Sequence, residues 1–584
     1  MKKLMSGNEA IARGAYEAGV TVAAAYPGTP STEILEHMVD YKENIYSEWA
    51  PNEKVACEVA IGASIAGSRS LAAMKHVGVN VAADPIFTYA YLGVNGGFVL
   101  VTADDPSMHS SQNEQDNRYY AKFAKMALIE PSDSQEAKDF LKEAYKISEE
   151  FDIPVLYRVT TRVCHSKSIV ELGEREEVGF KPYTRRLDKF VATPANAKIA
   201  HGVLEKKLKA LEAYANTSPL NLAEYNENTN IGIVTASVAY QYAKEVFGDK
   251  ASYLKLGFTY PLPMDMIRDF ASKFDTVYVI EELEPFMEEQ MKAAGIKCIG
   301  KELIPNMYEL NPDIVAKALL GINTESKTVD TNVVARPPVL CAGCPHRGFF
   351  YTMSKKKNTV IAGDIGCYTL GAMQPLEAMD SVICMGAGIS AAMGMAKSFE
   401  VTGRDTKVFG VVGDSTFFHS GITGAIDVVY NKGKMIPVVL DNSITGMTGH
   451  QENPGTGKTL MGEDTIALDP VDVLKAIGYK TVAVVDPCNL KAMNDTVEEA
   501  MQATEPYAIV TKRPCVLIKG LAPFKTKCEV VSDKCKKCKM CLKVGCPAIS
   551  FKNGVSYIEQ SMCVGCDVCM QVCKFDAIVK VGEQ

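Results

Sequence analysis

The stretch that decides the fold is KVFGVVGDSTFFHSG, residues 407–421. Its apolar run Val408–Val412 predicts a buried strand, and Gly413 and Asp414 follow that strand directly, before a segment of helical character. A strand, a tight turn and a helix N-terminus together form a ready anion site, because the first backbone N–H groups of a helix have no partner within it. We therefore expect an α/β fold with a parallel sheet and an anionic ligand at this turn.

A second strand end supplies a polar side chain that can act together with Asp414. The stretch PVVLDNSITGMTG, residues 437–449, places Asn442 directly after an apolar run, 28 residues beyond Asp414. An acidic side chain and an amide at adjacent strand ends can share one hard divalent cation, and the backbone carbonyl of Ile444 can add a third oxygen. The structural alternative is an ordinary aspartate at the end of a strand.

This Gly-Asp and Asn pattern resembles the diphosphate-binding signature of thiamin diphosphate (ThDP) enzymes. The resemblance implies ThDP and Mg²⁺ as cofactors. It carries the cofactor contacts onto Gly413, Asp414, Ser415, Asn442 and Ile444, with Asp414 and Asn442 as metal ligands. The third position departs from the family, which more often has glycine where this chain has Ser415. We expect a small serine to be tolerated there.

ThDP enzymes hold the cofactor between two similar α/β domains, so a second domain should carry a buried carboxylate. The stretch NEKVACEVAIGASIAGSRS, residues 52–70, combines two glutamates with small residues at helical spacing. It resembles the family's pyrimidine-activating helix, and the family's E-x-x-A order favours Glu53 as the catalytic and cofactor-binding glutamate over Glu58. Burial suits this role, because it raises a carboxyl pKa and lets the group share a proton with a ring nitrogen. Two solvent-facing glutamates on an amphipathic helix are the alternative.

Three further loops of the same domain are expected to surround the substrate. The stretch YPGTPSTEILE, residues 26–36, resembles 2-oxoacid:ferredoxin oxidoreductases, and the resemblance makes Thr29 a substrate contact. The stretches MKHVGVNVAADP (74–85) and DDPSMHSSQNEQDNRYY (104–120) occupy the next strand ends, where open parallel sheets bind ligands. They place His76 and His109 among the candidate catalytic residues, although either histidine could be structural.

The residue that binds the substrate carboxylate stays open at this stage. Family members for small substrates have an arginine near the position of Glu114. This chain has Arg118 instead, one helical turn further on.

Eight cysteines between residues 535 and 573 follow the bacterial two-cluster ferredoxin pattern. In this pattern the first three cysteines of each group bind one [4Fe-4S] cluster, and the fourth, more distant cysteine binds the other cluster. By that rule one cube has the ligands Cys535, Cys538, Cys541 and Cys573, and the other has Cys563, Cys566, Cys569 and Cys546. Two zinc knuckles are the alternative, but zinc sites use cysteines in pairs and leave the third cysteine of each triplet without a role.

A third cluster is predicted upstream. The stretches CAGCPHRG, GDIGCYTLG and KRPCVLIKG supply Cys341, Cys344, Cys367 and Cys515, a spacing that resembles the proximal [4Fe-4S] cluster of the oxidoreductase superfamily. A reduced C-x-x-C turn with two unrelated core cysteines is the alternative. The remaining cysteines look isolated, and we expect them to be core or incidental residues: Cys57, Cys164, Cys298, Cys384, Cys488 and Cys528.

Composition narrows the class of protein. The chain of 584 residues exceeds a single domain, and 47% hydrophobic with 23% charged residues is ordinary for globular proteins. No apolar run approaches the roughly 18 residues that cross a bilayer, and polar residues interrupt the N-terminal segment before a signal-peptide core forms. A net charge of −8 argues against general nucleic-acid binding. We expect a cytoplasmic enzyme.

Taken in order, these segments resemble the large subunits of the indolepyruvate ferredoxin oxidoreductases. The expected α/β architecture has two doubly wound ThDP-binding domains, 1–190 for the pyrimidine and 331–525 for diphosphate and Mg²⁺. Residues 191–330 form a linker and a transketolase C-terminal-type domain, and 526–584 form a small ferredoxin-like α+β domain.

The family implies oxidative decarboxylation of arylpyruvates to arylacetyl-CoA, with a smaller beta subunit in an α2β2 assembly and ferredoxin as electron acceptor. A related enzyme for another 2-oxoacid and an electron-transfer subunit with vestigial ThDP domains stay open as alternatives. A non-oxidative ThDP decarboxylase is disfavoured, since it needs no electron exit.

Overall fold

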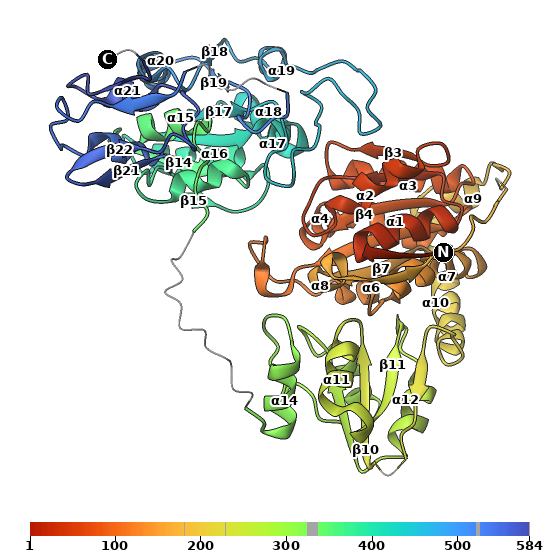
Figure 1. Cartoon of the computed structure of the whole chain (residues 1–584). Helices are drawn as coiled ribbons and strands as arrows, with labels where there is room; N and C mark the ends of the chain where they lie inside the picture. The colour runs from red at the N-terminus through yellow and green to blue at the C-terminus, as the bar shows by residue number, and fades with distance from the viewer. Residues whose placement is uncertain (180, 228, 324–336, 521–525, 583–584) are drawn as a thin grey trace. The chain divides into compact units, whose positions relative to one another are not determined.

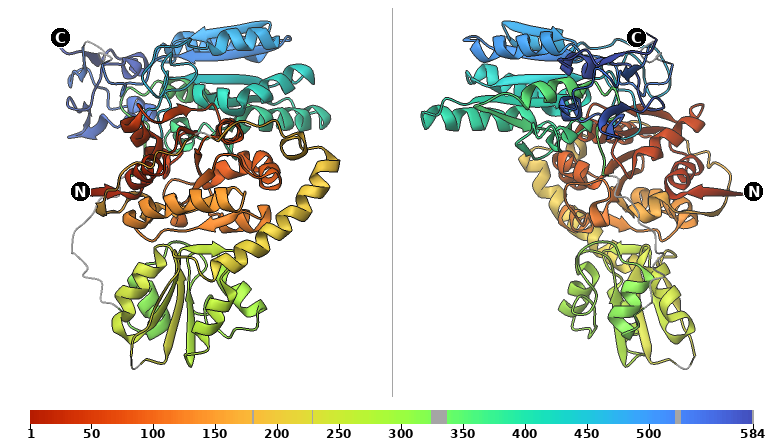
Figure 2. Two further views of the ribbon diagram at one scale, coloured as in Figure 1. Left: turned by 90° about the vertical axis from the view of Figure 1, so that its right-hand side faces the viewer. Right: turned by 60° about the vertical axis from the view of Figure 1, so that its left-hand side comes forward.

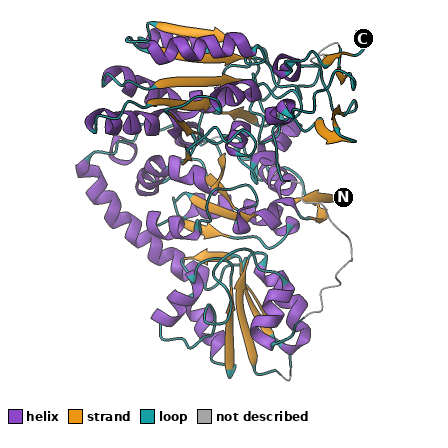
Figure 3. Cartoon of the chain, turned by 90° about the vertical axis from the view of Figure 1, so that its left-hand side faces the viewer, coloured by secondary structure: helices purple, strands orange, loops and turns teal. Residues whose placement is uncertain are grey.

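The computed structural model describes residues 1–584 except 180, 228, 324–336, 521–525 and 583–584. The chain divides into two compact units, Met1–Asp330 and Thr331–Gln584, which are described separately below. In both units helices lie against the faces of the sheets (Figure 3).

Unit 1 is built on a seven-stranded sheet of order β12-β6-β7-β5-β4-β2-β3. All neighbouring strands are parallel except the β12–β6 pair at one edge. The strands are β2 (Val22–Ala25), β3 (Tyr46–Trp49), β4 (Ser70–Lys75), β5 (Phe98–Asp104), β6 (Ala127–Ile129), β7 (Val155–Thr160) and β12 (Phe258–Tyr260). The central strands β4, β5 and β7 are buried along their whole length, as expected for a parallel sheet covered on both faces.

Helices of unit 1 pack in two groups against this sheet. One group contains α1 (Gly7–Glu17), α2 (Thr32–Met38) and α7 (Ser134–Glu150), and the other contains α3 (Glu53–Ile65), α4 (His76–Val81) and α5 (Ala83–Leu92). The chain then runs through α10 (Pro194–Ala215), the long yellow helix of Figure 2, which packs on α5. Smaller elements include α6 (Arg118–Ala124), α8 (Thr161–His165) and the antiparallel pair of β1 (Lys2–Ser6) and β8 (Lys167–Glu171).

A second, four-stranded sheet of order β13-β10-β11-β9 completes unit 1. Its strands are β9 (Leu222–Glu224), β10 (Ile231–Ala236), β11 (Ser252–Leu256) and β13 (Thr276–Ile280), with helices α11 (Ala239–Phe247), α12 (Met264–Ala271), α13 (Phe286–Ala293) and α14 (Pro312–Leu320). Strand β12 follows β11 but joins the seven-stranded sheet, and one apolar core contains residues of both sheets. Strand β12 thus lies beyond the expected boundary at 190/191 but belongs to the seven-stranded sheet, and the two sheets share one core.

Unit 2 contains a six-stranded, fully parallel sheet of order β15-β14-β16-β17-β19-β18. Its strands are β14 (Thr359–Gly363), β15 (Ser381–Val382), β16 (Lys407–Gly413), β17 (Ile436–Asp441), β18 (Thr481–Val485) and β19 (Tyr507–Lys512). The main helices are α15 (His346–Met353), α16 (Ala387–Val401), α18 (Ile422–Tyr430), α19 (Pro470–Ile477) and α20 (Leu490–Gln502). The deciding stretch forms β16, the short helix α17 (Asp414–Thr416), a π-helical turn Phe417–Gly421 and α18.

The cysteine-rich module at the end of unit 2 has only short elements. These are β20 (Cys528–Val530), β21 (Ile549–Lys552), β22 (Val555–Ile558), α21 (Val568–Val572) and β23 (Ile578–Lys580). Val544, Val568 and Val572 of the module belong to the same buried cluster as Phe350 of α15. Figure 1 shows the blue module beside the green helix α15. The module thus shares the core of the parallel domain, and the α/β class with a small α+β appendage is confirmed.

Each large sheet has a point where the strand order reverses. In unit 1 the chain places β3 on one side of β2 and then β4 on the other side, and in unit 2 it places β15 and β16 on opposite sides of β14. Ligands of open parallel sheets bind beyond the carboxyl ends of the strands at such switch points. We therefore expect ligands at the loops after β2 and β4 in unit 1 and at the loops after β14 and β16 in unit 2.

Candidate active site and cysteine cavities

Asp414, Asn442 and Ile444 lie together at the carboxyl ends of β16 and β17. The side-chain amide oxygen position of Asn442 lies 2.8 Å from the carbonyl oxygen of Ile444 and 3.1 Å from Oδ1 of Asp414. Two arrangements satisfy these oxygens: an amide turned to donate its NH₂ to both, or a divalent cation held by all three. The second arrangement is the one that the sequence predicts, and carboxylate, amide and carbonyl oxygens are suitable ligands for Mg²⁺.

The surroundings of Asp414 hold its carboxylate in place. Nδ2 of Asn453 donates to Oδ2 of Asp414 at 3.2 Å, which leaves Oδ1 facing Asn442. Burial, followed by the charge of nearby Asp441, raises the pKa of Asp414 to about 7. The hydroxyl of Ser415 accepts from Thr445 at 3.1 Å, so the turn after β16 is tied to the loop after β17. A Cβ at Gly413 would lie 2.6 Å from the ring of Tyr368, which leaves room only for glycine.

Glu53 and Glu58 occupy different surroundings on helix α3. Asn52 caps the helix by accepting from the backbone N–H of Val55, which fixes Glu53 at the first helical position. The Glu53 side chain is buried and packs on the backbone of Gly78, where a Cβ would lie 2.7 Å from Cγ of Glu53. Glu58 is 46% exposed and forms a surface ion pair with Lys54. Of the two, Glu53 is the glutamate with the burial that the sequence analysis required.

The loops after β2, β4 and β5 meet next to one another in unit 1. The hydroxyl of Ser110 donates to the backbone oxygen of Thr29 at 3.2 Å, and Nζ of Lys75 donates to the backbone oxygen of Ser110 at 2.7 Å. Lys75 also approaches Gly28, where a Cβ would lie 3.1 Å from Cβ of Lys75. Thr29 therefore lies at the switch point with a buried lysine that the sequence analysis did not single out.

The two candidate histidines differ in their surroundings. His76 is fully buried, Nε2 lies 3.2 Å from the backbone oxygen of Asn113, and burial lowers the pKa of its imidazole. Nδ1 of His76 is buried with no partner among the described residues. His109 is 43% exposed and lies 3.4 Å from Oε2 of Glu309. Buried His76, with Nδ1 unpaired among the described residues, is therefore the stronger candidate for a catalytic residue. His109 instead lies next to Glu309.

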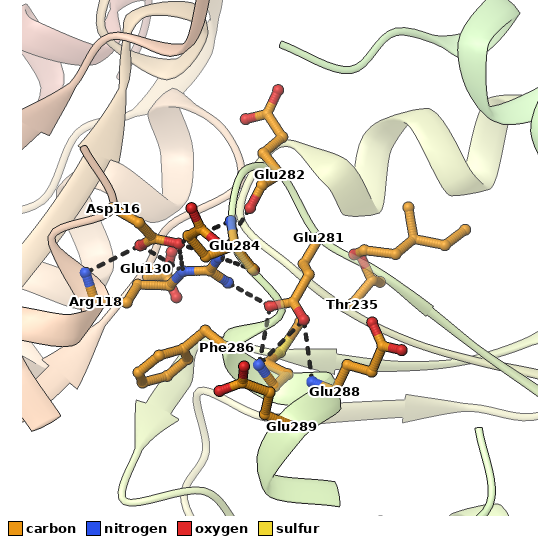
Figure 4. A network of polar contacts seen from close by, with 12 residues as sticks. Asp116, Arg118, Glu130, Thr235, Glu281, Glu282, Glu284, Phe286, Glu288 and Glu289 are labelled. Atoms are coloured by element: carbon orange, nitrogen blue, oxygen red, sulfur yellow. Dashed lines mark hydrogen bonds and ion pairs between the residues drawn. The ribbon is translucent and has the colours of Figure 1, made fainter. Parts of the chain in front are cut away.

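Arg118 takes part in a buried ion-pair network and not in a substrate site (Figure 4). Its guanidinium pairs with Asp116 at 2.5 Å and Glu281 at 2.6 Å, and it also donates to the backbone oxygens of Glu282 and Glu284. Glu114 accepts from the backbone N–H groups of Ser107 and Tyr308. Neither residue is arranged to bind the carboxylate of a small molecule.

Each predicted set of four tail cysteines surrounds its own cavity. One cavity is lined by Cys546, Cys563, Cys566 and Cys569, and the other by Cys535, Cys538, Cys541 and Cys573. Both sets include the cysteine that crosses from the other triplet. Zinc would draw four sulfurs to about 2.3 Å from one point, whereas a [4Fe-4S] cube is held by four thiolates around it. Four cysteines around a cavity fit a cube.

The predicted third set also comes together. Burial raises the pKa of the Cys367 thiol, with contributions from nearby Cys515 and Cys341, and burial raises the pKa of the Cys344 thiol, with contributions from nearby Cys367 and Cys341. This set adjoins the Asn442 loop: the backbone N–H of Cys515 donates to the backbone oxygen of Asn442 at 2.9 Å. A Cβ at Gly446 would lie 3.5 Å from Nδ2 of Asn442 and 3.6 Å from Sγ of Cys367.

Cys528, expected from the sequence to be a core or incidental residue, belongs to a buried core cluster of the cysteine-rich module. Cys528 is buried, lines the cavity of Cys563 and Cys569, and donates its backbone N–H to Sγ of Cys563 at 3.4 Å. Asn453 and Asp364 were not recognised in the sequence. Asp364 follows β14 at the switch point and accepts from Tyr368 and the backbone N–H of Gly386, and burial raises its pKa to about 6. The aspartate in GDIG, one turn before Cys367, is the signal that could have identified it.

Comparisons with known proteins agree with this geometry. The model of the thiamine pyrophosphate enzyme C-terminal TPP-binding domain matches residues 364–511. The thiamine-diphosphate-binding model of pyruvate flavodoxin/ferredoxin oxidoreductases matches 13–219, and the 4Fe-4S binding domain matches 556–579. These matches identify ThDP and iron–sulfur clusters as cofactors of the chain.

Two similar proteins are the indolepyruvate oxidoreductase subunits IorA of Archaeoglobus fulgidus and Pyrococcus horikoshii. The first is 42% identical, with 99% of this chain and 97% of the relative covered; the second is 40% identical, with 100% and 97% covered. A solved 2-oxoglutarate:ferredoxin oxidoreductase from Magnetococcus marinus aligns with 55% of this chain and 65% of its own at 15% identity and a TM-score of 0.47. On the strength of the full-length relatives, this chain belongs to the family of indolepyruvate oxidoreductase subunits IorA.

Proposed function

We propose that this chain is the ThDP-binding large subunit of an enzyme that oxidatively decarboxylates arylpyruvates to arylacetyl-CoA and CO₂ and passes the electrons to ferredoxin. The observation that carries the proposal is the proximity of the third predicted cysteine set to the loop of Asn442: the backbone N–H of Cys515 donates to the backbone oxygen of Asn442 at 2.9 Å, and Sγ of Cys367 lies near Gly446. An electron acceptor beside the cofactor is what an oxidative decarboxylase needs and a non-oxidative one does not.

Asp414, Asn442 and the carbonyl of Ile444 would hold Mg²⁺ and, through it, the diphosphate of ThDP. Buried Glu53 would exchange a proton with the aminopyrimidine, because a desolvated carboxyl can share a proton with a ring nitrogen. Bound ThDP supplies a carbon nucleophile and an electron sink. The contribution of the chain is to position the reactants and to exclude water from them.

Three [4Fe-4S] clusters would carry the electrons away. The set Cys341, Cys344, Cys367 and Cys515 adjoins the Asn442 loop, and the two tail sets line cavities in the cysteine-rich module. The intact polar residues at the ThDP site argue against the alternative of an electron-transfer subunit with vestigial domains.

Lys75 is the residue that we propose for the carboxylate of the oxoacid, since Arg118 is already paired with Asp116 and Glu281. Lys75 as a whole residue is only 9% exposed, it makes no ion pair with any described residue, and the hydrogen bonds of its ammonium go to the backbone oxygen and hydroxyl of Ser110. A buried cation without an anionic partner is costly. An oxoacid carboxylate beside Thr29 would supply the missing charge.

The relatives are named as subunits, which supports a companion subunit for this chain. We propose an α2β2 assembly with CoA as acyl acceptor. Among the described residues, no helix combines the length and apolar character needed to cross a bilayer. We infer a cytoplasmic complex.

The test is anaerobic reduction of a viologen dye by the purified complex with ThDP, Mg²⁺, CoA and one of three oxoacids. Indolepyruvate is expected to give the highest kcat/KM, and pyruvate and 2-oxoglutarate lower values. A preference for pyruvate or 2-oxoglutarate would move the enzyme to another member of the superfamily. Decarboxylation with equal rates in the presence and absence of the dye would support a non-oxidative enzyme.

A further inference from the structure

Arg347 is a buried cation between two of the cysteine sets. It is the second residue of α15 and is 1% exposed. One Nη nitrogen donates to the backbone oxygens of Leu340 and Cys341, at 2.6 Å and 2.8 Å. The other donates to the backbone oxygens of Val544 and Gly545, which precede Cys546. One guanidinium therefore joins the loop of Cys341 to the loop of Cys546.

None of the partners of Arg347 is an anion. All four hydrogen bonds go to carbonyl oxygens, and no carboxylate in the described part of the chain pairs with it. Its Nε is buried and has no partner there either. By contrast, the deeply buried guanidinium of Arg118, drawn in Figure 4, has two carboxylate partners. Because a buried charge needs a compensating charge, the pattern around Arg347 points to an anion that is not a carboxylate.

The position of Arg347 indicates which anion this is. The side chain lines the cavity of Cys546, Cys563, Cys566 and Cys569, and its Nη nitrogens donate to the backbone oxygens of Cys341 in one ligand loop and of Gly545, next to Cys546, in the other. The two ligand loops also touch: Gly343 has a φ of +74°, and a Cβ there would lie 2.2 Å from Cγ2 of Val564. A four-thiolate cluster carries net negative charge, and nearby charges and hydrogen bonds set its reduction potential.

We propose that Arg347 is the shared internal counter-ion of these two clusters and raises the reduction potential of both. The inference rests on the iron–sulfur part of the proposed function. One electron that leaves the Cys341/Cys344/Cys367/Cys515 cluster oxidises it by one unit and reduces the Cys546/Cys563/Cys566/Cys569 cluster by one unit. No proton transfer is required, because the guanidinium stays charged and compensates the negative charge on either side. Arg347 acts here as a positioning and tuning residue and not as a catalytic one.

The experiment is a redox titration of the anaerobically purified complex, followed by electron paramagnetic resonance. Arg347→Met removes the charge and keeps a long side chain, whereas Arg347→Lys keeps the charge. In the Met variant we expect two of the three clusters to become at least tenfold harder to reduce, a shift of about 59 mV for a one-electron couple. The Cys535/Cys538/Cys541/Cys573 cluster should be unchanged and serves as an internal reference. Arg404→Met, at an exposed arginine of the same unit, is the matched control.

The possible outcomes separate clearly. A Met variant with full iron content and three unchanged potentials would overturn the proposal, as would equal shifts in the Met and Lys variants. If the Met variant loses iron, the Lys variant decides between the outcomes. Iron content and potentials in the Lys variant near those of the unaltered chain would support a role for the positive charge. Iron loss in the Lys variant equal to that in the Met variant would refute it. Absence of iron from the unaltered chain would refute the cluster assignment itself, together with this inference.

Discussion

At the scale of single residues, the chain buries cations that form no ion pair with any described residue. Lys75 is the clearest case in unit 1. Burial lowers the pKa of its ammonium to about 8, and the nearby carboxylate of Asp105 offsets only part of this effect. A lysine that loses its proton near pH 8 can bind a carboxylate strongly below that pH and weakly above it.

Lys75 therefore predicts a pH dependence of substrate binding. The KM for the oxoacid should be constant below about pH 8 and rise above it, since the ammonium becomes a neutral amine. Below about pH 8, Lys75→Met should raise KM by roughly 10- to 150-fold, the equivalent of about 1.5–3 kcal/mol for a hydrogen bond to a charged group, and above that pH the difference from the unaltered chain should shrink. Lys75→Arg should keep a low KM up to higher pH. The measurement is KM from pH 6 to 9.5, with the KM for CoA as control; a break near pH 8 that persists in the Met variant would exclude Lys75.

At the scale of elements, helix α3 separates two glutamates by the face on which each lies. Glu53 is buried at the first turn, against Gly78 of α4, whereas Glu58 is exposed and paired with Lys54. The same helix thus offers a test residue and a control. Glu53→Gln keeps the shape and removes the proton-exchanging carboxylate, and Glu58→Gln makes the same change on the solvent face.

We expect Glu53→Gln to reduce kcat by at least 100-fold, the lower end of what general acid–base catalysis contributes, and to leave iron content unchanged. Glu58→Gln should retain kcat within about twofold, because exposed ion pairs contribute little. Viologen reduction and iron analysis of both variants measure this. Full activity in the Glu53 variant together with loss in the Glu58 variant would reverse the assignment.

Elements are also the scale at which the sequence was most informative. The order of apolar run, glycine and helix predicted β16 and its turn, because these local patterns are set by backbone geometry. The cysteine spacings gave the two tail sets, including the crossed Cys546 and Cys573. Lys75 and Arg347 could not be recognised in this way. A lysine that ends an apolar strand and an arginine in CPHRG look solvent-exposed, and only the packing of distant loops makes them buried.

At the scale of the whole chain, segments that the sequence analysis predicted as separate domains share a hydrophobic core within each unit. In unit 1 one apolar cluster joins the two sheets, and in unit 2 the cysteine-rich module packs Val544, Val568 and Val572 on the cluster of α15. The module is too small to bury much apolar surface by itself. Sharing a core helps to keep its ligand loops fixed with respect to Cys341 and Cys344.

Two ion pairs that join the sheets of unit 1 allow a matched prediction. Arg118–Glu281 is 2% exposed on both sides, whereas Arg162–Glu309 is 50% and 19% exposed. Arg118→Met leaves Glu281 buried without its ion-pair partner and leaves Asp116 only the more distant Arg158, at 3.9 Å, so it should cost about 3–5 kcal/mol, whereas Arg162→Met should cost about 0–1 kcal/mol. Glu281 accepts from the backbone N–H groups of Met287 and Glu288. Hydrogen exchange at these two amides should therefore accelerate in the Arg118 variant alone, and equal protection in both variants would show that the buried network does not hold the two sheets together.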